Sequence, residues 1–406
     1  MIPIAFLWTA LARAEAGADV LPLGLAAALA EAAAVNPEVL AARREAEAAA
    51  AGVWMAASPA MAMVEGARER DAGMASTNLT ARLDLPFPGT SLFTGRAASA
   101  AAAAKAARAR GVELEILARV RIAHARLWGA DDGVATATAG RDLMAQAAVI
   151  AQARVAGGKA GTEELLMAQA EASRMGVMLR MARNERDLAE ADLAALLHRP
   201  AGRDRFGPVT APDLPDPSLD RDALLATART DSPGALEAVH EARSAGAGAH
   251  AAALGILPRI SPFLTTKRYD GGGTGTMAGL GLSYPLFFWA PAAEAKAARR
   301  MAQAARARAA SAADEAARMA AGEASEWQAH AAAAREYRTV TLPLLAQAVR
   351  AARASYEAGR GDFLRLLAAG RDEVAGRREY AGEVVQTVEH QARLGAILGG
   401  AMEGKK

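Results

Sequence analysis

The stretch "RVAGGKAGTEELL" (residues 154–166) interrupts a long alanine-rich run with glycines, and the same interruption recurs as "SYEAGRGDFLRLL" at residues 355–367. The two stretches align without a gap, with Gly158 opposite Gly359. Glycine commonly ends helices because it adopts the left-handed conformation without steric cost. Each stretch therefore predicts a tight reversal between two long helices, and the pair predicts an internal duplication.

Further motif pairs extend this duplication over most of the chain. "NPEVL" (36–40) matches "SPGAL" (232–236), and each combines a capping side chain with proline at the first helical position. "LDLPFP" (83–88) matches "LSYPLF" (282–287), and both precede long runs of alanine with scattered charges. The order predicted for each repeat is helix, two extended segments, long helix, glycine break and long helix.

The boundaries of the repeats follow from these motifs. We place the first repeat at residues 17–197, with its turn at about 155–163, and the second at 223–397, with its turn at about 357–363. Residues 198–222 are proline-rich and predict a linker. Residues 398–406 form a tail, and residues 1–16 contain an apolar stretch and an A-x-A site, which predicts a signal peptide. That segment lacks Lys and Arg before its apolar part, so an ordinary buried N-terminal segment is the alternative.

The composition favours long helices and excludes several classes of function. The 406 residues are 52% hydrophobic but only 4% aromatic, and alanine-rich helices pack closely. The net charge of +2 comes from interspersed basic and acidic residues, so we expect no nucleic-acid partner. The absence of cysteine excludes disulfides and thiolate chemistry. Beyond the N-terminus, no run of about 18 apolar residues lacks charge, which argues against a transmembrane helix.

Alternating polarity predicts two hairpins, with strands at 53–66 and 74–87 and at 256–269 and 276–288. Between residues 75 and 87 the odd positions are mostly apolar and the even positions polar, which is the period of a strand with two different faces. The polar set, for which we predict a lumen-facing surface, is Ser76, Asn78, Thr80, Arg82 and Asp84. Four strands are too few for a stable sheet or a closed barrel. They form either hairpins packed on helices or one part of a lipid-facing barrel that several chains complete.

The helices are predicted to be long and to pair as coiled coils. About 60 proline-free residues from Arg96 to Val155 would extend roughly 90 Å. After the first glycine break, residues spaced by three and four form a heptad seam between Leu165 and Leu196, with Arg186 as its only polar member. Pro343 is predicted to kink or interrupt the helix before the second break.

Together these motifs resemble the outer-membrane efflux protein family typified by TolC. The resemblance rests on "NPEVLAARREAEAA" (36–49), on the proline-ended strand before each long helix, and on "YRTVTLPLLAQAVRAARASYEAGRGDFLRLLAAGRDE" (337–373) with its counterpart at 154–169. It covers residues 24–395, and the duplicated order of the motifs carries it more than any single motif.

The resemblance implies a mostly helical fold with a small β part. Long antiparallel coiled-coil helices would form an α-barrel, and each chain of a homotrimer would give four strands to a twelve-stranded transmembrane β-barrel. The protein would lie in outer-membrane lipid with a periplasmic helical tunnel. It would be a passive exit duct, without enzymatic activity or cofactors, docked to a periplasmic adaptor (membrane fusion) protein that connects it to an inner-membrane pump of the RND type or the ABC type.

The family's tip motif maps onto both glycine breaks. The adaptor-docking candidates that the resemblance implies are Gly158, Lys159, Gly161 and Thr162 in the first repeat, and Gly359, Arg360, Gly361 and Asp362 in the second. The acidic residues that narrow the tip in some members fall here on Arg365 and Ala368, whereas Glu164 occupies the matching place in the first tip. We therefore treat Glu164 and Arg365 as gate candidates and hypothesise that they contact each other.

We expect structural roles for the histidines, for the glycine-rich segment at 271–275 and for the methionines. The histidines are scattered without the spacing of metal ligands, so we expect solvated or capping residues and neither a metal site nor catalytic residues: His124, His198, His240, His250, His330 and His390. Gly271–Gly275 lies between strands and predicts a hairpin turn rather than a phosphate site. Met61 and Met63 share the apolar parity of the predicted first strand, which favours packing over binding of soft metals.

Three functions remain open at this point. The "YPLFFW" strand end and the context of Pro343 resemble the heavy-metal-cation branch of the family, so we expect a duct for metal cations or small toxic compounds. A duct for type I protein secretion is the alternative within the family. A periplasmic coiled-coil scaffold outside the membrane is the third, but a scaffold needs no amphipathic strands at equivalent positions of a repeat.

Overall fold

The computed structural model describes residues 23–58, 62–71, 74–200, 206–215 and 220–400. The predicted signal peptide lies outside these residues, as does most of the tail. The chain divides into two compact units. The first contains Met1–Leu40, Glu113–Leu224 and Met319–Lys406, and the second contains Ala41–Val112 and Leu225–Arg318.

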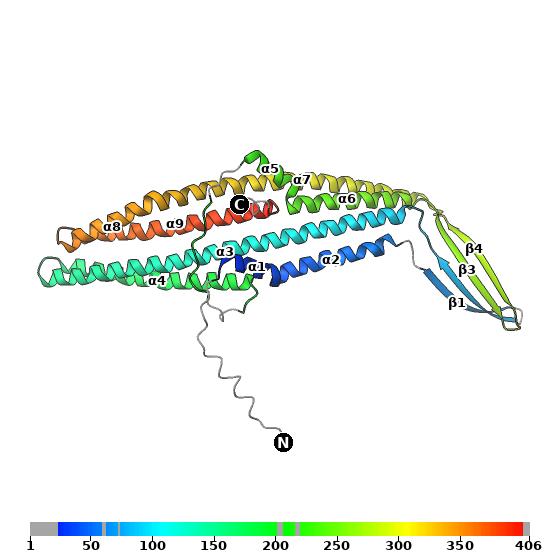
Figure 1. Ribbon diagram of the computed structural model, residues 1–406, viewed down its shortest axis with the longest axis horizontal. Helices are drawn as coiled ribbons and strands as arrows, with labels where there is room; N and C mark the ends of the chain where they lie inside the picture. Colours follow the sequence, from blue (N-terminus) through cyan, green and yellow to red (C-terminus); the bar gives the residue numbers. More distant parts are fainter. Residues whose placement is uncertain (1–22, 59–61, 72–73, 201–205, 216–219, 401–406) are drawn as a thin grey trace, which may run out of the picture. The chain divides into compact units, whose positions relative to one another are not determined.

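The order of elements confirms a duplicated, mostly helical fold with a small sheet (Figure 1). The first repeat contains α1 (Leu25–Val35), α2 (Pro37–Ala57), β1 (Ala62–Asp71), β2 (Met74–Leu83), α3 (Thr90–Ala156) and α4 (Thr162–Leu196). The second contains α5 (Arg221–Asp231), α6 (Pro233–Leu254), β3 (Arg259–Tyr269), β4 (Thr274–Ser283), α7 (Trp289–Glu336), a π-helical turn η1 (Tyr337–Thr341), α8 (Leu342–Glu357) and α9 (Phe363–Ile397).

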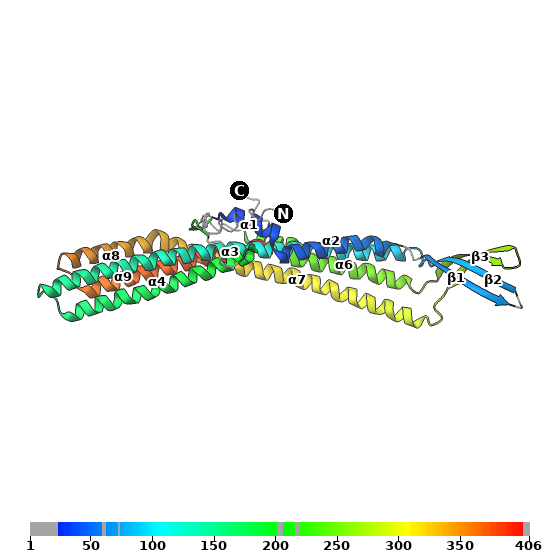
Figure 2. The same ribbon diagram turned by 90° about the horizontal axis from the view of Figure 1, so that it is seen from below.

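In the first unit, α3, α4, α8 and α9 lie side by side, and both interhelical turns lie at the same end (Figures 1 and 2). Next to the turns, a buried cluster combines residues of all four helices: Met144, Ala147, Ala151, Ala168, Met175, Tyr356, Phe363, Leu366 and Leu367. Alanine and glycine let the helices approach closely, since a Cβ on Gly370 would lie 2.9 Å from the Met144 methyl carbon. The predicted seam of α4 is confirmed, with Ala168, Met175 and Leu179 buried along it.

Pro343 interrupts its helix as predicted. Proline lacks an N–H and its ring clashes with the carbonyl one turn earlier, so an α-helix cannot pass through it undisturbed. The π-helical turn η1 accommodates the proline: η1 lies directly before α8, and Pro343 occupies the first turn of α8. Tyr337, the first residue of the π turn, donates a 2.8 Å hydrogen bond to Glu379 of α9.

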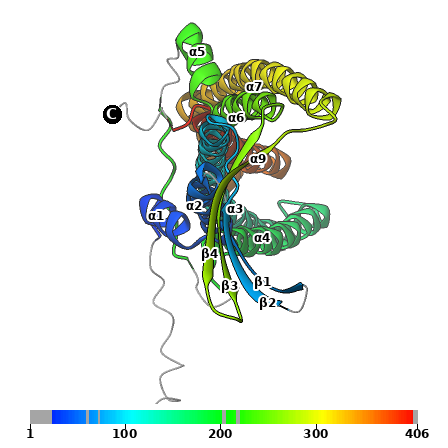
Figure 3. The ribbon, with the colours of Figure 1, turned by 90° about the vertical axis from the view of Figure 1, so that its right-hand side faces the viewer.

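The sheet belongs to the second unit and has the order β1-β2-β3-β4, with every neighbouring pair antiparallel (Figure 3). Pairing of β2 with β3 joins the hairpins of the two repeats into one sheet. The register places polar residues of β2 and β3 together on one face, where the hydroxyls of Thr80 and Thr265 lie 3.0 Å apart. The other face exposes large apolar side chains: Val64, Leu79, Leu264, Leu280 and Leu282.

Three details of the sequence prediction are wrong. The strand expected at 53–66 begins only at Ala62, because the alanine-rich α2 continues through Trp54 to Ala57. Met63 pairs with Arg82 and therefore shares the polar face, not the apolar one. Asn36 caps α2 by accepting the Glu38 N–H at 3.0 Å, whereas the Ser232 side chain makes no cap hydrogen bond to α6.

Among the described residues, no single helix has both the length and the apolar character needed to span a membrane. The pair α1 and α2 satisfies that test only when counted together, and it is bent by 47° at the break.

Candidate functional site

The first turn closes α3 with a left-handed glycine. Gly158 has φ +67°, and the Lys159 N–H donates to the Arg154 carbonyl at 2.8 Å, which is the wide-turn hydrogen bond of a Schellman motif. Gly161 then precedes α4 in an extended conformation. Gly158, Lys159, Gly161 and Thr162 are all exposed.

The second turn repeats this geometry at the predicted positions. Gly359 has φ +70°, and the Arg360 and Gly361 N–H groups both donate to the Ser355 carbonyl, at 3.1 and 2.9 Å. A Cβ on Gly361 would lie 2.9 Å from the Tyr356 nitrogen, so this position has no room for a side chain. Asp362 caps α9 by accepting the Leu364 N–H at 3.2 Å.

A buried contact joins the two turns. Tyr356 of α8 is fully buried and donates a 2.7 Å hydrogen bond to Glu164 of α4. The Arg154 guanidinium lies 4.9 Å from the centre of the Tyr356 ring, and its Nε lies 3.4 Å from the same Glu164 oxygen. Burial and the Glu164 carboxylate raise the pKa of Tyr356, so the phenol stays protonated and remains a donor. We call Arg154, Glu164 and Tyr356 the tip clamp.

The hypothesised contact between Glu164 and Arg365 is wrong, because Tyr356 and Arg154 occupy Glu164 instead. Phe363 and Leu366 of α9 face the buried cluster, and this helix phase leaves Arg365 exposed. A pair that does link α9 to α4 lies two turns farther on, where Arg371 donates to both carboxylate oxygens of Glu171 at 2.9 and 2.6 Å. These hydrogen bonds, opposed by burial, hold the pKa of Glu171 below its usual value.

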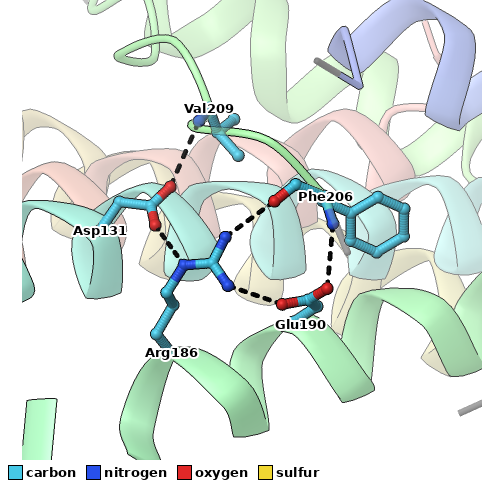
Figure 4. Close-up of polar contacts among 5 residues, drawn as sticks. All are labelled: Asp131, Arg186, Glu190, Phe206 and Val209. Carbon is cyan, nitrogen blue, oxygen red and sulfur yellow. Dashed lines mark hydrogen bonds and ion pairs between the residues drawn. The ribbon is translucent and has the colours of Figure 1, made fainter. Parts of the chain in front are cut away.

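Arg186, the polar member of the α4 seam, anchors the segment between the repeats (Figure 4). Its guanidinium donates to Asp131 of α3 at 2.7 Å, to Glu190 at 2.6 Å and to the Phe206 carbonyl at 2.8 Å. The two carboxylates also accept backbone N–H groups, from Phe206 to Glu190 at 2.9 Å and from Val209 to Asp131 at 3.2 Å. Burial alone lowers the pKa of Arg186, but the two carboxylates outweigh it and raise the pKa.

Residues 206–215 of the predicted linker therefore form a strap fixed on the helices. Phe206 is 2% exposed, and the Arg199 guanidinium lies 5.4 Å from the centre of its ring. Val209 and Leu214 pack against a cluster that contains Trp128 and Val384. The prolines exclude a helix here, and the extended backbone instead offers its N–H and C=O groups to Arg186 and its two carboxylates.

Arg186→Ala should release this strap. The change removes the donor to the Phe206 carbonyl and leaves two neighbouring carboxylates without their cation, and hydrogen bonds to charged groups contribute about 1.5–3 kcal/mol each. We expect the amide hydrogens of Phe206 and Val209 to exchange at least about tenfold faster, measured by hydrogen-exchange mass spectrometry. Arg183→Ala, which removes an exposed arginine of the same helix, is the control; equal exchange in both variants would contradict the anchoring role.

The polar residues of β2 share one face, as their parity predicts. Ser76 is buried, Asn78 and Thr80 are half-buried, and Arg82 is exposed. Asp84, just beyond the strand, accepts a 2.5 Å hydrogen bond from Ser261.

The expectation that the histidines are solvated or capping residues is wrong for His124. His124 is 4% exposed and contacts the Leu23 carbonyl at 3.2 Å, and burial lowers its pKa. His330 and His390 are 60 positions apart in sequence, but the fold brings them together with Glu323, Glu326 and Glu383. The spacing "EWQAH" (326–330) puts a carboxylate and an imidazole one helical turn apart and was the only local signal of this cluster.

Comparison with known proteins identifies the class. The model of the family "Outer membrane efflux protein" matches residues 224–400. The cobalt-zinc-cadmium resistance protein CzcC of Cupriavidus metallidurans is 26% identical over 395 residues, which cover 93% of this chain and 90% of CzcC. The structure of CusC is similar with a TM-score of 0.79 at 18% identity, over 94% of this chain and 93% of CusC. The MtrE channel of Neisseria gonorrhoeae gives 0.76 at 19% identity, over 93% and 89%.

The duplicated helices, the paired turns and the four-stranded sheet thus define an outer-membrane efflux channel. Residues 224–400 match the outer membrane efflux protein family, of the TolC type, and the chain is a distant homologue of CzcC. Members of this family are channels and not enzymes.

Proposed function

We propose that this chain is the exit duct of a tripartite RND-type efflux system that exports divalent metal cations. The observation that carries the cargo class is the similarity to CzcC, a cobalt-zinc-cadmium resistance protein, over 93% of this chain. The proposed complex contains a homotrimer of the chain, a periplasmic adaptor and an inner-membrane pump.

The sheet supports a trimer whose strands close a barrel in outer-membrane lipid. Its strands contain 10, 10, 11 and 10 residues, and a membrane-spanning strand needs about 9–11. One face is apolar and exposed, and exposed apolar patches mark surfaces that meet lipid or protein. Three copies would supply twelve strands, with the face of Asn78 and Thr80 toward the lumen. Directly after β4 an exposed group of Tyr284, Phe287, Phe288 and Trp289 suits a membrane interface.

The two interhelical turns support docking to a periplasmic adaptor. Both turns expose a left-handed glycine followed by a basic residue, Lys159 or Arg360. The buried cluster and the tip clamp hold these small exposed surfaces in place, as a recognition site on a rigid element requires. The tip clamp is also the proposed gate, because it joins the two helical hairpins next to their turns.

The cargo class is tested in the native host by deleting the gene and measuring the lowest zinc, cobalt and cadmium concentrations that stop growth. We expect the deletion to lower the inhibitory concentrations of the three metals at least fourfold, and we expect the gene on a plasmid to restore them. A deletion that sensitises the cells only to organic toxic compounds, or that blocks export of a protein, would overturn the metal assignment. The outer-membrane channel itself would stand in either case.

A further inference from the structure

We propose that α7 and α9 carry a binding site for one divalent transition-metal ion, formed by Glu326, His330 and His390. One ligand atom of each of the three residues lies within 4.8 Å of the other two. The site lies within the first compact unit, far along the sequence from both turns. It does not depend on the cargo that the channel exports.

Each of the two histidines also contacts a glutamate on the opposite helix. The His330 and His390 rings are parallel, at an interplanar angle of 2°, with their centres 5.3 Å apart. His330 of α7 meets Glu383 of α9 at 2.7 Å from its Nδ1, and His390 of α9 meets Glu323 of α7 at 2.8 Å from its Nδ1. Each imidazole is therefore oriented by a carboxylate of the opposite helix.

These partners fix the tautomer. A carboxylate can only accept, so each Nδ1 carries the hydrogen, and in a neutral ring the lone pair is then on Nε2. A histidine that binds a metal through one nitrogen commonly donates its other N–H to a carboxylate, which orients the ring and strengthens it as a ligand. Glu383 and Glu323 occupy that position relative to His330 and His390.

Glu326, the third ligand, lies within reach of the His330 Nε2. A Glu326 carboxylate oxygen lies 3.8 Å from the His330 Nε2. Ligand atoms about 2 Å from a common ion lie roughly 3–3.5 Å apart, so small side-chain rotations complete the set. Glu326 has a side-chain exposure of 60% and His330 of 27%, so an ion can enter from solution.

The donor types select the class of ion. Two imidazole nitrogens and one carboxylate oxygen suit Zn²⁺ and Co²⁺, whereas Mg²⁺ and Ca²⁺ prefer oxygen ligands alone. Glu323, Glu326 and Glu383 place three carboxylates around the two imidazole rings, and a divalent cation offsets their negative charge. Because the ligands come from two helices, a bound ion would also tie α7 to α9.

The test measures binding to the detergent-purified full chain, with Zn²⁺ in calorimetry and Co²⁺ in visible absorption. We expect one ion per chain, with Co²⁺ bands typical of nitrogen and oxygen ligands. His390→Ala should weaken binding at least about 100-fold and Glu326→Gln at least about tenfold. Glu383→Gln, which leaves the three ligands in place, should weaken it about 10- to 100-fold through the orientation of His330.

His240→Ala is the matched control, because His240 lies on α6 outside the cluster and its loss should change Zn²⁺ affinity less than twofold. Glu326→Gln replaces an exposed side chain and keeps both histidine–glutamate pairs, so it tests the site even where a histidine variant fails to assemble. Zn²⁺ binding that is the same in wild type, Glu326→Gln and His390→Ala would overturn the proposal, as would the absence of binding in the wild type. The cluster would then be a polar link between the helices.

Discussion

Leu264→Arg should reduce the amount of assembled channel in the outer membrane to less than about a tenth of wild type. Leu264 lies in the middle of β3, is 49% exposed, and shares its face with Ala81 of β2 and Ala278 of β4 through the register. If this face meets lipid, an arginine here places a charge near the middle of the bilayer. That costs about 2–4 kcal/mol in each chain of the trimer.

The matched control is Met277→Arg. Met277 is 57% exposed on the neighbouring strand, but it lies opposite Thr265 and therefore on the polar face of the sheet. The two variants add the same charge at nearly the same height and differ in the face that carries it. Quantitative blots of outer-membrane fractions, with and without heating to dissociate trimers, measure the result. Equal loss in both variants, or none in either, would contradict a lipid-facing apolar surface.

The parts of the fold that sequence could predict are those encoded by short local patterns. The left-handed glycines at 158 and 359 mark helix ends through their own backbone freedom, and the alternation around Thr80 marks a two-faced strand. Duplication then reinforced each weak signal with a second copy. Where the local pattern was ambiguous the prediction failed, as at Trp54, where helix propensity of the preceding alanines carried α2 beyond the expected strand start.

The parts that sequence could not predict depend on which face each long helix turns toward its neighbours. Glu164 meets Tyr356 across 192 residues, and His330 meets Glu383 across 53. A shift of one residue in the phase of α9 turns a side chain by about 100°, which is enough to exchange a buried position for an exposed one. The sequence therefore located the tip but assigned Arg365 to a contact that Arg154 makes. Likewise, the heptad pattern identified Arg186 as a polar member of the seam. It did not predict that Arg186 binds the Phe206 carbonyl of the strap.

Arg154→Ala should open the tip of the channel and raise its conductance. Arg154 and Glu164 have side-chain exposures of only 19% and 16%, and Glu164 also accepts from Tyr356. Removing the cation leaves a mostly buried carboxylate without its charge partner, and loss of one member of a buried pair costs about 3–5 kcal/mol. Even about 1.4 kcal/mol after screening by solvent changes the ratio of open to closed tips tenfold.

Two other variants should change the conductance less than Arg154→Ala does. Tyr356→Phe keeps the buried ring and removes one hydrogen bond to Glu164, so it should raise conductance less than Arg154→Ala does. Arg353→Ala removes an arginine of α8 whose pair with Glu357 is about half exposed at both ends. Exposed pairs contribute at most about 1 kcal/mol, so this control should behave as wild type. Single-channel recordings of the purified trimer in planar bilayers measure all three. If Arg154→Ala conducts like Arg353→Ala, the tip clamp holds the hairpins together without gating the channel.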